Sequence, residues 1–121
     1  MSHAVILLAH GSRDPAWRAP MEAVARQIAL LSPFTPALCA YLELSEPTLA
    51  QAGATLVGNG AQNIRIVPML LGVGKHARED IPRLVAELKI RHPQVAFELA
   101  PAVGESAVLV DLLARIALGR G

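Results

Sequence analysis

The sequence has little cysteine, few aromatic residues and few charges. Its 121 residues include one cysteine, 3% aromatic residues and 17% charged residues. A single cysteine excludes an intrachain disulfide and fits a reducing compartment, so we expect a cytoplasmic protein. The neighbours of Cys39 are Leu38 and Ala40, which predicts a buried structural thiol rather than a metal ligand.

Two classes of partner are also excluded by what the chain lacks. The net charge is +1, whereas nucleic-acid binding depends on clustered Lys and Arg. No apolar run reaches the roughly 20 residues that span a membrane. The longest runs, 64–73 and 107–118, are interrupted by Pro68, Asp111 and Arg115. From the charge and the short apolar runs we expect neither a nucleic acid nor a membrane as partner. A strand pattern begins near the N-terminus, so we also expect no signal peptide.

Hydrophobic residues, in contrast, are abundant. They make up 53% of the chain, above the average for globular proteins. A length of 121 residues predicts a single domain over residues 1–121, and a domain of this size can be helped by dimerisation. A buried sheet together with a subunit interface would absorb the excess of apolar residues.

Strand and helix patterns alternate four times. Continuous apolar or partly alternating runs predict strands over 4–9, 37–43, 63–71 and 94–99. Apolar residues at helical spacing predict helices that end near Leu31, Gly58, His92 and Ile116. We expect Ser45 to cap the second helix with Pro47 in its first turn, the third helix to start near Asp80 and the fourth near Glu105.

Four strand–helix units with short connections predict an α/β fold. Right-handed crossovers give a three-layer sandwich whose four-stranded, mainly parallel sheet has helices on both faces. The expected strand order is 2-1-3-4, which makes the first and third strands neighbours. Such sheets bind ligands at the carboxyl ends of their strands.

Two histidines follow those neighbouring strands. His10 comes directly after the first strand, and His76 follows the third strand and Gly72-Val73-Gly74. Taken alone, His10 would be interpreted as a loop residue bonded to the backbone. Two imidazoles at one sheet edge favour a shared metal ion or a shared proton transfer.

The glycines before His76 predict a tight loop with backbone N–H groups near a ligand. Plain turn geometry explains Gly72 and Gly74 equally well. The segment is not a dinucleotide fingerprint, because the spacing and the acidic partner are missing. We therefore expect no nucleotide cofactor.

Acidic and basic residues lie at the same predicted edge. Glu43 ends the second strand and is the better candidate for a carboxylate in the crevice, whereas Glu46 suits the first turn of a helix. Two histidines and a carboxylate suit Co²⁺, Ni²⁺, Fe²⁺ or Zn²⁺. Three basic residues lie at the same predicted edge: Arg13, Lys75 and Arg78. Such residues are usually only solvated, but grouped at one edge they could bind a polycarboxylate ligand.

Three segments carry a resemblance to a known family. They are Ala9-His10-Gly11-Ser12-Arg13-Asp14-Pro15, residues 41–47 and residues 67–82, with Pro101 and Gly104-Glu105 near the end. On these segments the chain resembles the short, single-domain class II chelatases of the CbiX type, the sirohydrochlorin cobaltochelatases.

The resemblance implies a chelatase-like fold and insertion of a divalent metal into a tetrapyrrole without ATP, in cobalamin or sirohaem-type biosynthesis. It implies that His10 and His76 handle the metal and that Glu43 is the active-site acid, with Glu46 the alternative. Larger relatives carry two such domains, so it also implies a homodimer. The physiological metal and the exact tetrapyrrole stay open.

Other functions fit parts of the pattern. The segment around His10 is similar to a phosphohistidine phosphatase signature, but Ala9 stands where such sites need arginine. A carrier of divalent metal and a tetrapyrrole-binding module without catalysis remain as alternatives.

Overall fold

The sheet consists of four parallel strands in the order β2-β1-β3-β4. The structure is a computed structural model that describes residues 2–121. The strands are β1 (His3–Ala9), β2 (Ala37–Tyr41), β3 (Asn63–Pro68) and β4 (Ala96–Leu99). The predicted fold class and strand order are therefore confirmed.

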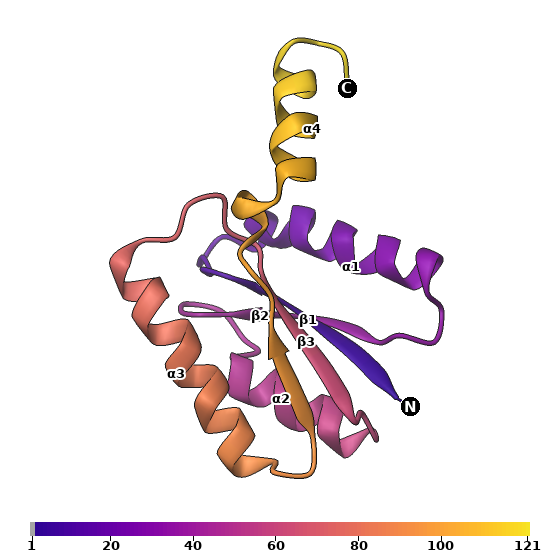
Figure 1. The fold of residues 1–121 in the computed structure, drawn as a ribbon, viewed down its shortest axis with the longest axis vertical. Coiled ribbons are helices and arrows are strands. Elements are labelled where there is room, and N and C mark those ends of the chain that lie inside the picture. Colours follow the sequence, from indigo (N-terminus) through magenta and orange to yellow (C-terminus); the bar gives the residue numbers. More distant parts are fainter. Residues whose placement is uncertain (1) are drawn as a thin grey trace.

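Helices lie on both faces of this sheet (Figure 1). The helical segments are η1 (Pro15–Arg18), α1 (Ala19–Leu31), α2 (Leu49–Gly58), α3 (Lys75–Arg91), η2 (Val103–Glu105) and α4 (Ala107–Ala117). Helices α2 and α3 cover one face, and α1 covers β1 and β2 on the other. Helix α4 covers neither face. It projects beyond the end of the sheet at which β4 ends, in the direction of the β4 arrow.

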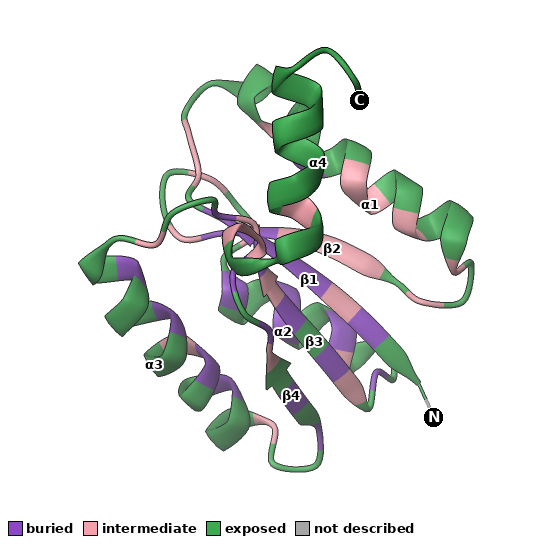
Figure 2. Ribbon diagram, turned by 45° about the horizontal axis from the view of Figure 1, so that its top comes forward, coloured by how far each residue is buried: buried purple, intermediate pink, exposed green. Residues whose placement is uncertain are grey.

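The core has a large and a small part, one on each face of the sheet. Figure 2 shows buried residues along the strands and on parts of α2 and α3. Ile6, Ile64 and Ile66 are almost fully buried between the strands and the helices α2 and α3. On the opposite face a smaller cluster joins Leu7 and Met21 under α1. The alternation of side chains along each strand sends successive residues to the two clusters.

Two strands end earlier than predicted. β2 ends at Tyr41 rather than at residue 43, and β3 ends at Pro68 rather than at residue 71. Leu44 has a left-handed φ of 61°, an uncommon conformation for a residue with a side chain, and it turns the chain out of the sheet.

The start of α2 also differs from the prediction. The N-cap is Thr48, not Ser45, and Thr48 and Gln51 form a capping box. Pro47 precedes the helix, and its peptide bond to Glu46 is cis. The prediction of Ser45 as cap, Pro47 in the first turn and Glu46 as a first-turn acid is therefore wrong, because Ser45 makes a non-local contact described below.

Helix α3 starts five residues earlier than predicted, at Lys75 instead of Asp80. Pro82 lies inside the helix, where it removes one backbone hydrogen bond. The helix continues through it because Ala77 and Ile81 extend the buried stripe of Val85 and Leu88 toward the N-terminus.

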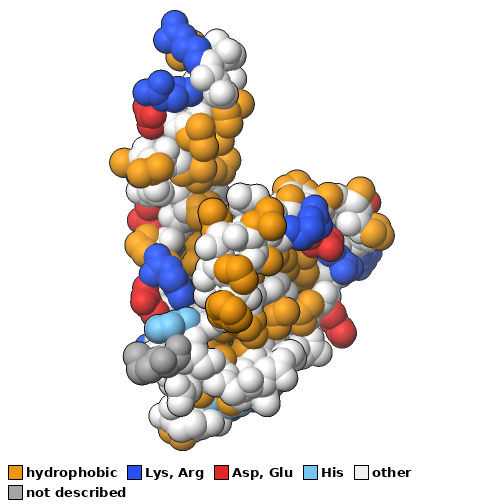
Figure 3. All heavy atoms as spheres, turned by 90° about the vertical axis from the view of Figure 1, so that its right-hand side faces the viewer, with side chains coloured by type: hydrophobic (Ala, Val, Ile, Leu, Met, Phe, Trp, Pro, Cys, Tyr) orange, Lys and Arg blue, Asp and Glu red, His pale blue; other side chains and the backbone are white. Residues whose placement is uncertain are grey.

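The last helix starts at Ala107, two residues later than predicted, with Ser106 as its N-cap. Figure 3 shows hydrophobic side chains along one side of this helix, beside a hollow between α4 and the body of the protein. Among the described residues, no helix is long and apolar enough to cross a membrane.

Candidate active site

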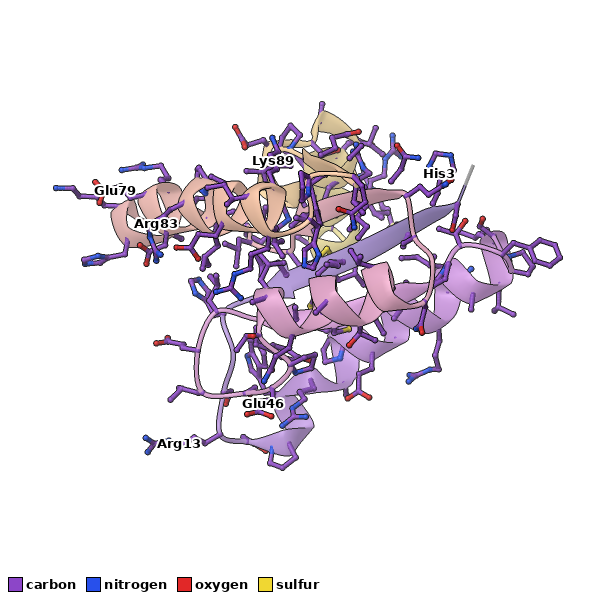
Figure 4. All side chains as sticks on the ribbon, turned by 90° about the horizontal axis from the view of Figure 1, so that it is seen from below. His3, Arg13, Glu46, Glu79, Arg83 and Lys89 are labelled. Atoms are coloured by element: carbon purple, nitrogen blue, oxygen red, sulfur yellow. The ribbon has the colours of Figure 1, made fainter. Side chains whose placement is uncertain are left out.

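The candidate site lies at the carboxyl ends of β1 and β3, which are adjacent in the sheet. Leu8 is level with Pro68, and the N–H of Met69 donates to the carbonyl of Leu8 at 2.7 Å. The loops after the two strands therefore leave the sheet side by side. Figure 4 shows Arg13, in the loop after β1, and Glu79, on α3, at this end of the sheet, whereas His3 lies at the opposite end.

The loop that carries His10 is joined to the loop after β2. The N–H of Glu43 donates to the carbonyl of His10 at 2.9 Å. The hydroxyl of Ser45 donates to the carbonyl of Ser12 at 2.6 Å and accepts from the N–H of Ser12 at 3.3 Å. These bonds place Glu43 directly beside His10 and explain why Ser45 does not cap α2.

Gly11 makes this close approach possible. It has a φ of 109°, and a Cβ atom built on it would lie 1.7 Å from the carbonyl oxygen of Glu43. Only glycine satisfies both the left-handed φ and the contact. The sequence signals that close approach is possible at Gly11, but not that its partner is Glu43.

His76 is the second residue of α3 rather than a loop residue. The N-cap of this helix is Gly74, which offers no side-chain hydrogen bond to the first turn. The N-terminus of a helix with free N–H groups favours anions. Lys75 and Arg78 lie in the same turn, so this end of α3 is suited to a carboxylate group.

The two glycines of this loop have no steric requirement in the structure. A Cβ atom at Gly72 or Gly74 would meet no atom within 4 Å, and neither has a left-handed φ. The structure therefore does not show that turn geometry requires glycine at these two positions. Their role in ligand binding stays a prediction.

The predicted site residues share an edge without forming a closed metal site. His10, His76 and Glu43 are all exposed. Within residues 2–121, no group of three or more His, Cys, Asp or Glu side chains is placed to hold a metal ion. The roles of His10, His76 and Glu43 stay predictions.

The predicted basic residues are also exposed. The ion pairs of the described part of the chain join other residues, on β3–β4, along α3 and along α4, and leave Arg13, Lys75 and Arg78 unpaired. Their charges are therefore available to a ligand with carboxylate groups.

An apolar groove of about 630 Å³ opens beside these residues, between the ends of β3 and β4 and the start of α3. Arg78 and Glu105 are its charged lining residues. The apolar lining is formed by Pro68, Leu71, Val73, Ala77, Ile81, Pro82, Leu99, Ala100, Pro101 and Ala102. Its volume is in the range of small-molecule sites.

The sequence does not predict this groove, because its walls come from segments far apart in the chain. One signal is Gly104, whose N–H donates to the carbonyl of Leu70 at 3.1 Å. A Cβ atom at Gly104 would lie 1.8 Å from the carbonyl oxygen of Leu71. Gly104 thus holds the segment after β4 against the segment after β3.

A second hollow, of about 360 Å³, lies on the α1 side and contains Glu46, Glu22 and Cys39. Burial, and secondarily the nearby Glu22, raises the pKa of the half-buried Cys39 thiol. The neutral form of the thiol is therefore favoured more than in a free cysteine, and the structural role of Cys39 stays a prediction. Burial and the neighbouring Cys39 also raise the pKa of Tyr41, whose ring lies 6.0 Å from that of Trp17.

The chain is similar to several known proteins. The CbiX family model matches residues 4–117. The sirohydrochlorin cobaltochelatase of Saccharolobus solfataricus is 32% identical in an alignment of 117 residues, and the match covers 92% of this chain and 90% of that protein.

Two solved structures extend the comparison. A structure described as a CbiX protein of cobalamin (vitamin B12) biosynthesis from Marinobacter aquaeolei VT8 is 31% identical with a TM-score of 0.78, and the match covers 98% of this chain and 99% of that one. The sirohydrochlorin chelatase SirB from Bacillus subtilis subspecies spizizenii, in complex with cobalt, is 27% identical with a TM-score of 0.80. The match covers 97% of this chain and 50% of SirB, so this chain spans half of that protein.

Proposed function

This chain belongs to the CbiX family, and from that membership we propose that it inserts a divalent metal ion, first of all Co²⁺, into sirohydrochlorin or a closely related tetrapyrrole without ATP. The observation that carries the proposal is the adjacency of β1 and β3. Because their loops leave the same edge, His10 and His76 belong to segments that start side by side. The metal ion and the tetrapyrrole are both substrates of this reaction.

In this proposal the imidazoles of His10 and His76 hold the incoming ion. Imidazole is a good ligand for Co²⁺, Ni²⁺ and Fe²⁺, and the choice among them depends on availability and geometry. The absence of a three-ligand group within the described residues suits an ion that must be handed over. Two protein ligands leave coordination positions open for water and then for the pyrrole nitrogens.

Metal insertion replaces two pyrrole N–H protons with one divalent ion, so a base must accept protons. We assign this role to Glu43, because its N–H is bonded to the carbonyl of His10 at 2.9 Å and the two residues are held together. Glu46 is the weaker candidate, since it lines the separate hollow on the α1 side. General-base help of this kind is worth roughly 10²- to 10⁴-fold in rate.

The acidic side chains of the tetrapyrrole need cationic partners. Arg13, Lys75 and Arg78 supply three unpaired cations at this edge. The apolar groove next to Arg78 suits the flat apolar part of a macrocycle, because small-molecule sites combine apolar walls with a few polar groups.

Removing two of these cations should weaken tetrapyrrole binding. The double variant Lys75→Gln/Arg78→Gln is expected to raise KM for the tetrapyrrole about tenfold with a smaller change in kcat, because charge-assisted contacts are lost. Steady-state rates at varied tetrapyrrole concentration measure the effect. Arg83→Gln is the matched control: it lies on α3 but is already paired with Asp80 and Glu87, and an equal rise in KM there would contradict the assignment.

An absorbance assay with sirohydrochlorin and Co²⁺ tests the function itself. Insertion of the metal changes the absorbance spectrum of the macrocycle. An enzyme makes this change faster than it occurs without protein, whereas a carrier or a binding module binds its ligand without speeding the conversion. The same assay with Ni²⁺ and Fe²⁺ ranks the metals. A rate equal to that without protein for all three ions would refute the proposed activity.

We further propose that two copies work together as a homodimer. SirB, which is about twice the length matched here, supports a functional unit of two such domains. The high apolar content of the chain, 53%, also favours an interface between subunits.

A further inference from the structure

Arg18 carries a buried hydrogen-bond donor that its own chain does not satisfy. Within residues 2–121, Nε of Arg18 is the one buried side-chain nitrogen or oxygen without a hydrogen-bond partner. A buried polar group without a partner costs free energy, and the cost is larger for a charged group. Folded proteins keep few such groups, so each of them needs an explanation. A ligand that accepts from Nε would supply one.

The side chain of Arg18 is held in place by aromatic rings. Arg18 ends η1 and is the N-cap of α1. Its guanidinium carbon lies 5.7 Å from the centre of the Tyr41 ring, and a cation over an aromatic face is attracted to it. Tyr41 is buried, and the ring of Trp17 lies 6.0 Å from its ring. The guanidinium is therefore oriented before a ligand arrives, which lowers the cost of binding.

Arg18 lines the second hollow of about 360 Å³, which we call the α1-side hollow. Its volume lies at the lower end of the range of small-molecule sites. Burial raises the pKa of both Cys39 and Tyr41, so neither group is charged at neutral pH. The uncharged lining consists of Ala25, Ala37, Leu38, Cys39, Tyr41 and Pro47. The half-buried guanidinium of Arg18 thus lies in a largely uncharged wall.

Three further charged residues lie at the rim of this hollow: Glu22, Arg26 and Glu46. All three are exposed, so water and salt screen their charges. Glu22 lies one helical turn beyond Arg18, a spacing at which ion pairs form readily. The ion pairs of the described chain nevertheless include neither Arg18 nor any of the three. Arg18 is therefore the free charge that is least exposed to water, and an anion gains most from it.

The shape of the guanidinium selects a carboxylate among anionic groups of small molecules. Its Nε–H and one Nη–H point in parallel and match the two oxygens of a carboxylate. This contact would satisfy the buried Nε of Arg18. We infer that the α1-side hollow binds one carboxylate group of a ligand, which Arg18 holds through Nε–H and Nη–H.

Two sources supply such a carboxylate. Tyr41 is level with Ala9, which precedes the candidate active-site loop, so an acidic side chain of the tetrapyrrole would reach the hollow across the sheet edge. The other source is a free small carboxylic acid. Figure 4 shows Glu46 well away from Glu79 on α3, so the hollow is distinct from the groove beside α3. With the first source the inference rests on the proposed function, and with the second it does not.

NMR of the metal-free protein tests the carboxylate site itself. The Nε–H signal of Arg18 is identified by its loss in Arg18→Met. It should shift when succinate or sirohydrochlorin is added and should exchange more slowly with water, because a carboxylate accepts its hydrogen. Sodium chloride at equal ionic strength controls for screening. If both compounds affect the signal only as chloride does, water alone satisfies Nε and the inference is overturned.

Fluorescence of Trp17, the one tryptophan of the chain, measures affinity for whichever of the two compounds shifts the signal. Arg18→Met should raise the dissociation constant about tenfold. Arg18→Lys should raise it nearly as much, because an ammonium group lacks the parallel donors. Arg26→Met is the matched control: it removes the same charge from the rim of the same hollow and should bind within about threefold of wild type. Equal losses in Arg18→Met and Arg26→Met would overturn Arg18 as the donor.

Competition distinguishes the two sources. If the tetrapyrrole fills the hollow, saturating sirohydrochlorin prevents the shift by succinate, and Arg18→Met weakens sirohydrochlorin binding. If a free acid is the ligand, succinate still shifts the signal beside bound sirohydrochlorin, and Arg18→Met leaves sirohydrochlorin binding unchanged. Either result supports the carboxylate site. Because neither metal nor turnover enters these measurements, this inference and the proposed activity fail separately.

Urea denaturation separates ligand binding from a structural role. Arg18→Met keeps an apolar stem over Tyr41 and removes the unsatisfied donor. Without ligand, its unfolding midpoint should therefore be no lower than that of the wild type. The compound that shifts the signal should raise the midpoint of the wild type and not that of the variant. A variant with a clearly lower midpoint in the absence of ligand would make Arg18 a structural residue and overturn the inference.

Discussion

Alanine at His10 or at His76 is expected to lower kcat/KM for cobalt insertion about 100-fold or more, because each change removes a proposed ligand of the incoming ion. The fold should persist in both variants. Both residues are exposed, and exposed substitutions usually change the free energy of unfolding by less than about 0.5 kcal/mol. Initial rates from the absorbance of the macrocycle measure the effect, after subtraction of the uncatalysed rate.

His3→Ala is the matched control for these two variants. His3 is exposed at the start of β1, at the opposite end of the sheet (Figure 4). Its replacement should leave the rate within about twofold of wild type, because a distant exposed residue has no part in transition-state binding. If His10→Ala and His76→Ala both turn over like His3→Ala, the two histidines do not handle the metal.

Gly11→Ala should be the most damaging small change in the candidate site. The new Cβ atom would lie 1.7 Å from the carbonyl oxygen of Glu43, on a backbone with a φ of 109°. Relief of this clash separates the loop of His10 from the loop of Glu43. We expect a loss of about 2 kcal/mol or more in the free energy of unfolding, measured by urea denaturation.

The same variant should lose cobalt insertion even where it is fully folded, since His10 and Glu43 no longer keep their relative positions. Gly72→Ala is the control for stability alone, because its Cβ atom would meet nothing within 4 Å. We expect it to keep wild-type stability within about 0.5 kcal/mol. Equal stability of Gly11→Ala and Gly72→Ala would contradict the described contact between the loops.

The strands could be predicted from the sequence because each is a short, largely apolar run between turn-forming residues. Their order could be predicted because four strand–helix units with short, right-handed connections favour the order 2-1-3-4. The exact starts of the helices were harder to predict than the strands. Pro82 suggested a helix start near Asp80, but the buried stripe that begins at Ala77 overrides that local signal. Ser45 has the side chain of a helix cap, yet it bonds to Ser12, a residue 33 positions away. Local patterns do not contain such contacts.

The candidate site could be predicted in part for the same reason. That His10 and His76 reach one edge follows from the strand order alone. The groove beside Arg78 did not follow, because its walls come from β3, β4 and α3 together.

X-ray absorption at the cobalt edge of the Co²⁺-loaded protein, without tetrapyrrole, tests most directly the claim that His10 and His76 bind one ion. We predict two imidazole ligands per cobalt in the wild type and one in each of His10→Ala and His76→Ala. Two imidazoles that persist in either variant, or a wild type whose cobalt has only oxygen ligands, would contradict the claim.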